Sequence, residues 1–375
     1  MNFDLNEEQQ LLQESVQKFV QNDYDFESRR KLVSSDRGYS EAHWQTFAEL
    51  GWLGVPFAEA DGGFGGGPIE TMLLMQEMGK ALVVEPYLAT VVLFGGCLRR
   101  GGSPEQRERL LGGIVAGELQ GALGFTEPQS RFNLLDVATQ ASAANGGYVL
   151  NGLKGVVLNG ANADQLIVSA RTSGDTRDPE GISLFLVDAN APGVERRGYP
   201  TVDGQRAAEV RLNNVRVSNQ DLVGELDGGA SLLQAVIDEG ILAVGAEAVG
   251  CMEKLVHTTV EYSKTRKQFD QPIGQFQALQ HRMVDMFIAQ EQAKSMMYLA
   301  AMRMAEAAPD AEKVVAAFKV QVGNSARLVG QEAVQLHGGM GQTDELDVGH
   351  YFKRLTVIQH QFGDVDHHLG RFGAL

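Results

Sequence analysis

Cysteine, tryptophan and long hydrophobic runs are scarce in this 375-residue chain. The two cysteines, Cys97 and Cys251, lie far apart, so the sequence indicates neither a thiolate metal site nor a CxxC redox pair. Reduced thiols of this kind are typical of a cytoplasmic protein. The most apolar run, residues 87–98, is only about half as long as the roughly 20 residues that a membrane-spanning helix needs. A transmembrane segment is therefore not expected.

Positive charge is also in short supply. The chain has 32 Lys and Arg against 48 Asp and Glu, a net charge of −16. This balance argues against nucleic acid or an anionic membrane as the main partner, although a local basic patch for an anionic substrate is compatible with it. Residues 1–8 are acidic where a signal or transit peptide would be basic, which predicts a cytoplasmic location.

Three regions of different hydrophobic periodicity follow one another. Residues 1–120 show the three- and four-residue spacing of amphipathic helices. Residues 121–225 predict short strands without intervening helices, which favours an antiparallel β-barrel. Residues 226–375 predict long helices in an antiparallel bundle. The expected fold class is α+β, with an N-terminal all-α domain, a middle β-barrel domain and a C-terminal four-helix bundle.

Two glycine-containing segments predict turns. The run at residues 61–67 is followed by Pro68; it lacks the Lys-Ser/Thr of a phosphate-binding loop and no strand precedes it. We therefore expect a structural turn there. The pair Asn151-Gly152 predicts a second turn, between two strands of the middle region.

Several motifs resemble one known family. Residues 262–277 (Tyr-Ser-Lys-Thr-Arg-Lys-Gln-Phe-Asp-Gln-Pro-Ile-Gly-Gln-Phe-Gln) resemble the signature Tyr-x-x-x-Arg-x-x-Phe-Gly-x-Pro-Ile-x-x-Phe-Gln of the acyl-CoA dehydrogenase family. Residues 335–341 resemble its Gln-x-x-Gly-Gly-x-Gly, residues 50–56 its N-terminal domain, and residues 126–128 its flavin-side segment. The matches span nearly the whole chain in the right order. The resemblance implies an FAD flavoprotein that desaturates acyl-CoA thioesters at the α,β position.

The resemblance also implies which residues bind FAD, whose ADP half family members hold across a dimer interface. A diphosphate needs a permanent cation with fork geometry, which Arg266 supplies. Glycines let backbone N–H groups approach the cofactor closely, and Gln335 offers a neutral donor and acceptor to the adenosine half. The expected cofactor-binding residues are Arg266, Gln268, Phe269, Phe276, Gln277, Gln335, Gly338 and Gly339.

The flavin-side segments depart from the family pattern. The family reads Thr-Glu-Pro-x-x-Gly-Ser-Asp, but Arg131 and Phe132 occupy the Gly and Ser positions here. After Gly-Leu-Lys154, the residues Val156 and Leu158 replace an aromatic residue and a threonine. The hydroxyl that relatives place near flavin N5 is therefore missing.

The general base is missing from both positions where relatives carry it. Abstraction of an α-proton needs a carboxylate in a dry pocket. The Glu that most relatives place before a Gly falls on Phe362, and the alternative position falls on Gly240. Glu239 and Asp364 are the nearest carboxylates, but a one-residue shift on a helix turns a side chain by about 100°. The catalytic residue therefore stays unassigned, with Glu239 and Asp364 as weak candidates.

The C-terminal histidines do not predict a metal site. His350, His360, His367 and His368 surround Asp364, yet their spacing matches no known ligand set. Surface or interface histidines are the expected outcome.

The losses and the retained motifs follow a pattern. Elements for the chain's own flavin and proton abstraction are degraded, whereas those for a neighbour's FAD are intact. This pattern resembles the non-catalytic small subunits of α2β2 acyl-CoA dehydrogenases, such as those of pimeloyl-CoA dehydrogenases. The resemblance implies a homologous catalytic subunit as partner, a dicarboxylyl- or other bulky acyl-CoA as substrate, and an electron-transferring flavoprotein as acceptor.

Three alternatives stay open from the sequence. The first is a self-sufficient homotetrameric dehydrogenase with an off-position base. The second is a flavin monooxygenase or a nitroalkane-oxidase-like relative, in which the acyl-CoA base is also missing. The third is a scaffold that has lost FAD; the intact Arg266 and Gln335 argue against it, because a scaffold needs no diphosphate ligands.

Overall fold

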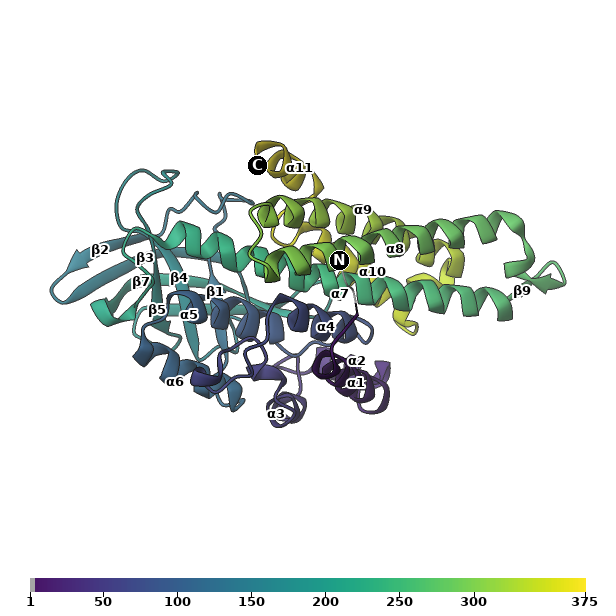
Figure 1. The fold of residues 1–375 in the computed structure, drawn as a ribbon, viewed down its shortest axis with the longest axis horizontal. Helices are drawn as coiled ribbons and strands as arrows, with labels where there is room; N and C mark the ends of the chain where they lie inside the picture. Colours follow the sequence, from purple (N-terminus) through teal and green to yellow (C-terminus); the bar gives the residue numbers. More distant parts are fainter. Residues whose placement is uncertain (1–3) are drawn as a thin grey trace. The chain divides into compact units, whose positions relative to one another are not determined.

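The computed structural model describes residues 4–375 (Figure 1). The contacts divide the chain into two compact units, each built from separate stretches of sequence. The helical unit comprises Met1–Lys31, Gly67–Val83 and Ile241–Leu375. The sheet unit comprises Leu32–Gly66 and Val84–Gly240. Helices, strands and helices follow one another along the chain as predicted, and the three-domain division at residues 1–120, 121–225 and 226–375 stays a proposal.

Long antiparallel helices dominate the helical unit. α8 and α9 pack along each other, and α10 and α11 pack against α9 (Figure 1). A buried ion pair joins α7 to α10, because the Arg354 guanidinium donates to both oxygens of Glu247 at 2.6 Å. The elements with most or all of their length in this unit are α1 (Glu7–Asn22), α2 (Phe26–Ser34), α4 (Pro68–Gly79), α7 (Gly229–Thr265), β9 (Lys267–Gln268), β10 (Gln271–Pro272), η5 (Ile273–Gln275), α8 (Gln277–Ala305), α9 (Ala311–His337), η6 (Gly338–Gln342), α10 (Asp347–His360) and α11 (Val365–Ala374).

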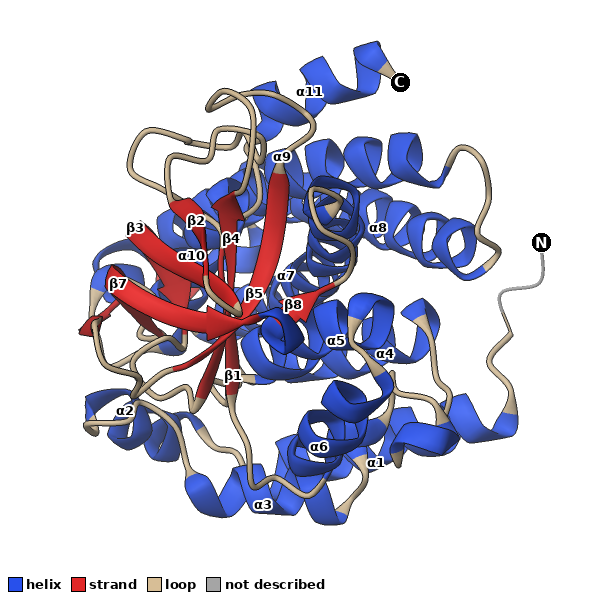
Figure 2. Cartoon of the chain, turned by 90° about the vertical axis from the view of Figure 1, so that its left-hand side faces the viewer, coloured by secondary structure: helices blue, strands red, loops and turns tan. Residues whose placement is uncertain are grey.

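One eight-stranded sheet forms the centre of the sheet unit (Figure 2). Its order is β6-β7-β3-β2-β4-β5-β8, and β1 pairs in parallel with β4. Among residues 4–375 no pairing joins β6 to β8, so the predicted barrel is a sheet with two ends. The strands are β1 (Gly121–Gly124), β2 (Gln140–Ala144), β3 (Gly147–Leu158), β4 (Gln165–Arg171), β5 (Ile182–Asp188), β6 (Val194–Pro200), β7 (Arg206–Ser218) and β8 (Leu222–Val223).

Short helices complete the sheet unit. η3, a π-helical stretch, is fully buried and packs on β1, because its residues are nearly all apolar. The helices of this unit are α3 (Glu41–Glu49), η1 (Trp52–Gly54), η2 (Glu59–Asp61), η3 (Leu88–Phe94), α5 (Gly95–Gly101), α6 (Pro104–Val115) and η4 (Asn219–Asp221). Among residues 4–375 no helix combines the length and the apolar character that crossing a membrane requires.

Of the two predicted turns, one is confirmed and the other is wrong. The glycine run before α4 is a turn in which Gly62 and Gly65 have φ of 83° and 68°, values that favour glycine. Asn151 and Gly152 instead lie inside β3, where a register shift against β7 marks a bulge. Gly152 is needed there because a Cβ would come within 2.3 Å of the Thr139 hydroxyl oxygen. The hairpin turn lies at the earlier pair Asn145-Gly146, between β2 and β3.

Candidate functional site

The signature motif folds as a helix end followed by a small hairpin. The Arg266 backbone N–H donates to the Tyr262 carbonyl at 2.8 Å, and the Arg266 carbonyl accepts from the Ile273 N–H at 2.8 Å. Phe269 and Asp270 form the two-residue turn between β9 and β10, with φ of 53° and 62°. Two left-handed residues are what a type I′ hairpin turn requires. The hairpin thus fixes Arg266 at its base.

The two C-terminal motifs meet through a ring stack. The Tyr262 ring lies on the His337 ring with centroids 4.3 Å apart and planes 29° apart. His337 Nδ1 lies 2.8 Å from the Ala333 carbonyl oxygen. Burial lowers the pKa of His337. The stack therefore places the hairpin that carries Arg266 beside the C-terminal end of α9.

The predicted cofactor-binding groups near this stack are open to solvent. The Arg266 side chain is exposed and has no hydrogen-bond or ion-pair partner in the described part of the chain. Gly338 has φ of 61°, and a Cβ at Gly338 or Gly339 would meet nothing within 4 Å. Gln335 is exposed in the last turn of α9. A free guanidinium beside accessible glycine backbone has the donor chemistry that a diphosphate needs.

The remaining predicted cofactor-binding residues lie on or next to the hairpin. Phe269 is 85% exposed at its tip, and its ring makes an edge-to-face contact with Phe276 at 6.0 Å. Gln268 donates its side-chain amide to the Lys267 carbonyl at 2.8 Å. Gln277 is exposed and begins α8. These groups share the hairpin region, and their cofactor role stays a proposal.

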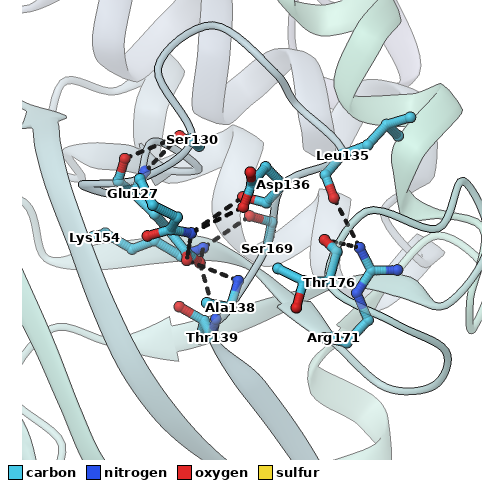
Figure 3. A network of polar contacts seen from close by, with 11 residues as sticks. Glu127, Ser130, Leu135, Asp136, Ala138, Thr139, Lys154, Ser169, Arg171 and Thr176 are labelled. Atoms are coloured by element: carbon cyan, nitrogen blue, oxygen red, sulfur yellow. Dashed lines mark hydrogen bonds and ion pairs between the residues drawn. The ribbon is translucent and has the colours of Figure 1, made fainter.

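A buried network fixes the flavin-side segment in the sheet unit (Figure 3). Glu127 accepts a hydrogen bond from the Lys154 ammonium at 2.7 Å and from the backbone N–H groups of Ala138 and Thr139 at 2.8 and 3.0 Å. Lys154 also donates to the Ser169 hydroxyl at 3.0 Å. The side chains of Lys154 and Glu127 are 0% and 2% exposed. The segment that begins at Thr126 is thus tied to β3 and β4.

Electrostatics keep the carboxylate of this network ionised. Burial alone would raise the pKa of Glu127, but the Lys154 ammonium and the hydrogen bonds outweigh it and lower the pKa to about 2. Glu127 therefore holds the segment in place and does not act as a base near neutral pH. From the sequence, Glu127 and Lys154 were recognisable only as motif positions. The available signal was a lysine at an inward-facing position of a strand.

The substituted flavin-side positions offer few polar groups. Val156 is 47% exposed on β3, and Leu158 is half-buried at the strand's end. Arg131 is exposed with φ of 48°, and Phe132 is half-buried. Val156 and Leu158 carry no hydroxyl, so neither side chain can supply the hydrogen bond near flavin N5 that the family resemblance led us to expect.

The C-terminal base position is a tight turn without a carboxylate of its own. Phe362 and Gly363 have φ of 60° and 111°. His368 Nε2 lies 2.9 Å from the Phe362 carbonyl oxygen. Asp364 accepts the His367 backbone N–H at 2.9 Å and so caps the N-terminus of α11. The nearest carboxylate thus has a structural role.

Basic side chains hold the other candidate, Glu239. Arg99 donates to both Glu239 oxygens at 2.6 Å, and Arg100 donates to the same carboxylate through Nε at 3.1 Å. A Cβ at Gly96 would lie 3.4 Å from Glu239 Oε2, so α5 closes over the group. Proton transfer to this carboxylate would weaken charge-assisted hydrogen bonds from two guanidinium groups. The geometry disfavours Glu239 as a general base.

Within the described residues, the acidic and imidazole side chains do not assemble a metal site. Throughout residues 4–375, no group of three or more His, Cys, Asp or Glu side chains is arranged to hold a metal ion. His367 and His368 contact each other edge to face, with ring centroids 5.0 Å apart.

Comparisons with known proteins match the chain along its whole length. The acyl-CoA dehydrogenase N-terminal, middle and C-terminal domain models match residues 6–118, 122–215 and 227–371. The probable acyl-CoA dehydrogenase YngJ of Bacillus subtilis (strain 168) is 31% identical over 367 residues, covering 96% of this chain and 95% of YngJ. The short-chain-specific acyl-CoA dehydrogenase of Megasphaera elsdenii is 31% identical over 319 residues, 83% of each chain.

Solved structures also match this chain over its full length. The ChsE4-ChsE5 complex from Mycobacterium tuberculosis matches with a TM-score of 0.90 and 29% identity, covering 100% of this chain and 98% of the other. The FAD complex of PigA matches with a TM-score of 0.93 and 27% identity over the same shares of the chains. These comparisons confirm the predicted α+β fold class and FAD as the cofactor of the family. The chain belongs to the acyl-CoA dehydrogenase family.

Proposed function

We propose that this chain is the non-catalytic small subunit of an FAD-dependent acyl-CoA dehydrogenase. It completes the FAD site of a homologous catalytic subunit in an α2β2 assembly. One observation carries the proposal: the Arg266 guanidinium is exposed and unpartnered beside the sterically open Gly338-Gly339 backbone, whereas the carboxylates next to both base positions are engaged. A chain with its own complete site would need one of those carboxylates free.

The relatives support an assembly of two different chains. ChsE4-ChsE5 is a complex of two differently named chains. The Tcur3481-Tcur3483 steroid ACAD also pairs two names, and it matches with a TM-score of 0.88 and 28% identity. We propose that the partner resembles this chain in sequence, and that the two chains assemble in the cytoplasm.

For the acyl substrate and the electron acceptor, we propose only a chemical class. The named relatives act on groups as different as short-chain acyl-CoA and a prolyl group on a carrier protein. We propose a dicarboxylyl- or other bulky acyl-CoA for this complex. An electron-transferring flavoprotein is the proposed acceptor, and an electron transferring flavoprotein structure from Acidaminococcus fermentans has a chain that matches with a TM-score of 0.92.

The roles of this chain's residues follow from their geometry. FAD, when bound, supplies the acceptor for the hydride that leaves the β-carbon. Arg266 would bind the diphosphate, and the Gly339 N–H would approach the phosphates or ribose, since no Cβ at Gly338 or Gly339 blocks the way. Gln335 would orient the adenosine half. Phe362 and Gly240 supply no proton acceptor, so α-proton abstraction falls to the partner.

Flavin stoichiometry tests the proposal directly. The chain is purified alone and after co-expression with its presumed partner, and FAD is measured per protomer by absorbance. We expect little flavin on the chain alone and about one FAD for every two chains in the complex, because only one half-site per pair is complete. One FAD per protomer on the lone chain would contradict the proposal.

Arg266→Ala is expected to weaken FAD retention in the assembled complex by about 10- to 150-fold, because a charge-assisted diphosphate contact is lost. The measurement is the apparent Kd for FAD after removal and titration of the cofactor. Lys264→Ala is the matched control, since the Lys264 ammonium is exposed and already pairs with Glu261 at 2.6 Å. An FAD affinity equal to that of the control would remove Arg266 from the site.

A further inference from the structure

A cavity of about 400 Å³ opens at one end of the sheet unit, apart from every residue assigned above. We propose that it binds a small organic carboxylate, a function beyond the proposed subunit role. Its lining comes from strands β4, β5 and β7, the helices α6 and η4, and the loops before β1 and after β5.

Strand direction separates this cavity from the flavin-side segment. β1 and β4 run in parallel, and Gly121 at the start of β1 pairs with Gln165 at the start of β4. The cavity lies at that starting end, with Leu119 and Gln165 in its wall. The segment that contains Glu127 follows the other end of β1. The cavity is therefore a second site within the sheet unit and not an extension of the first.

Hydrogen bonds hold the walls in place. The Gln106 side-chain amide on α6 donates to the carbonyls of Gln220 and Leu222 at 2.8 and 3.1 Å. The Gln120 N–H donates to the Asp164 carboxylate at 2.8 Å, which ties the loop before β1 to β4. A cavity whose walls are fixed in this way requires little rearrangement when a ligand binds.

The charges around the cavity are not equivalent. Asp188 accepts the Asn190 N–H at 2.7 Å, and Asp221 accepts the Ser218 N–H at 2.7 Å, so both carboxylates already have donors. The guanidinium groups of Arg109 and Arg216 have no hydrogen-bond or ion-pair partner within residues 4–375. Both arginines are exposed, so their guanidinium groups can be reached from solvent, and a carboxylate matches guanidinium geometry with two acceptor oxygens.

The apolar part of the lining determines the rest of the ligand. Four tightly packed aliphatic side chains form the apolar wall of the cavity. They are between 1% and 8% exposed: Leu110, Leu186, Val187 and Val217. Because these residues expose little surface themselves, the gain comes from the ligand: the hydrocarbon body of an aliphatic or aromatic carboxylate leaves water when it lies against them, and a hydrated inorganic anion has no such body. The geometry favours a carboxylate with a short hydrocarbon body, such as hexanoate or benzoate.

Calorimetric titration of the full chain with hexanoate tests the site, with inorganic phosphate as the comparison. We expect hexanoate to bind saturably and at least about tenfold more tightly than phosphate, since each buried CH₂ contributes about 0.8 kcal/mol. Arg109→Gln and Arg216→Gln should each weaken hexanoate binding about tenfold or more. Arg211→Gln, an exposed arginine on the same strand β7 that does not line the cavity, should leave it unchanged.

A second measurement keeps the test decisive if a variant folds poorly. Methyl NMR of the unmodified chain should show hexanoate-dependent shifts at Leu110, Leu186, Val187 and Val217. Absence of saturable hexanoate binding, equal affinity for phosphate, or shifts confined to other methyl groups would each overturn the assignment. Loss of binding in the Arg211→Gln control would do the same.

Discussion

Lys154→Met is expected to lower the free energy of unfolding of the sheet unit by about 3–5 kcal/mol. The substitution leaves the Glu127 carboxylate, whose side chain is 2% exposed, without the cation that lies 2.7 Å away. The remaining donors at Glu127 are mainly backbone N–H groups and one side-chain amide, which carry no charge. Urea unfolding followed by tryptophan fluorescence reports the change, because both tryptophans, Trp44 and Trp52, belong to the sheet unit.

A double variant separates the ion pair from simple loss of packing. Glu127→Gln combined with Lys154→Met removes both charges, and we expect it to recover much of the stability lost in the single variant. Lys264→Met, which breaks an exposed pair with Glu261, should cost far less than Lys154→Met. A Lys154→Met variant as stable as the Lys264→Met control would contradict the assigned role of the network.

The acid side of the pH profile provides an independent check. The pKa of Glu127 is lowered from 4.5 to about 2 in the folded chain, so the unfolded chain binds its proton first as the pH falls. The stability from this group is fully present above pH 4.5 and is lost as the pH falls toward 2. We expect the unmodified chain to lose about 3 kcal/mol over this interval that Glu127→Gln does not lose. Equal acid profiles would show that Glu127 is not the group responsible.

The features that could be predicted from sequence are those encoded by local spacing. The signature around Arg266 could be recognised from sequence because its residues are consecutive, but the turn at Phe269 and Asp270, where both residues adopt left-handed φ, was not predicted. The helical periodicity of residues 226–375 predicted long helices, and α9 is one of them because its apolar residues face one side. The glycine run before Pro68 predicted a turn because it lacks both the Lys-Ser/Thr and the preceding strand of a phosphate-binding loop.

The features that could not be predicted depend on contacts between distant residues. Asn151-Gly152 favours a turn locally, but pairing of β3 with β7 along its length overrides that preference and turns the pair into a bulge. The stack of Tyr262 on His337 and the ion pair of Lys154 with Glu127 need the tertiary fold to bring the partners together. The neutralisation of Glu239 by Arg99 and Arg100 depends in the same way on α5 lying beside α7. The motif positions were readable from sequence, whereas their protonation and pairing were not.

The lone chain is expected to reduce dye with acyl-CoA at least about 10²–10⁴-fold more slowly than the complex, the usual cost of removing a general base. Phe362 and Gly240 cannot accept an α-proton, Asp364 caps α11, and Glu239 is held by two guanidinium groups. The measurement is acyl-CoA-dependent dye reduction by the chain alone and by the co-purified complex, with saturating FAD in both assays.

Two conservative variants in the complex decide whether the general base belongs to the partner subunit or is Glu239 or Asp364 of this chain. Glu239→Gln and Asp364→Asn keep the size of each side chain and remove its charge, so either would abolish turnover if that carboxylate abstracted the proton. We expect both variant complexes still to reduce dye with acyl-CoA. Any decrease in the rate would then come from the lost ion pairs of Glu239 or from the lost N-cap of α11. A lone chain that turns over and is silenced by one of these substitutions would identify that carboxylate as the base. The chain would then be a self-sufficient dehydrogenase in which a guanidinium-bound or capping carboxylate has taken over the role of the missing glutamate.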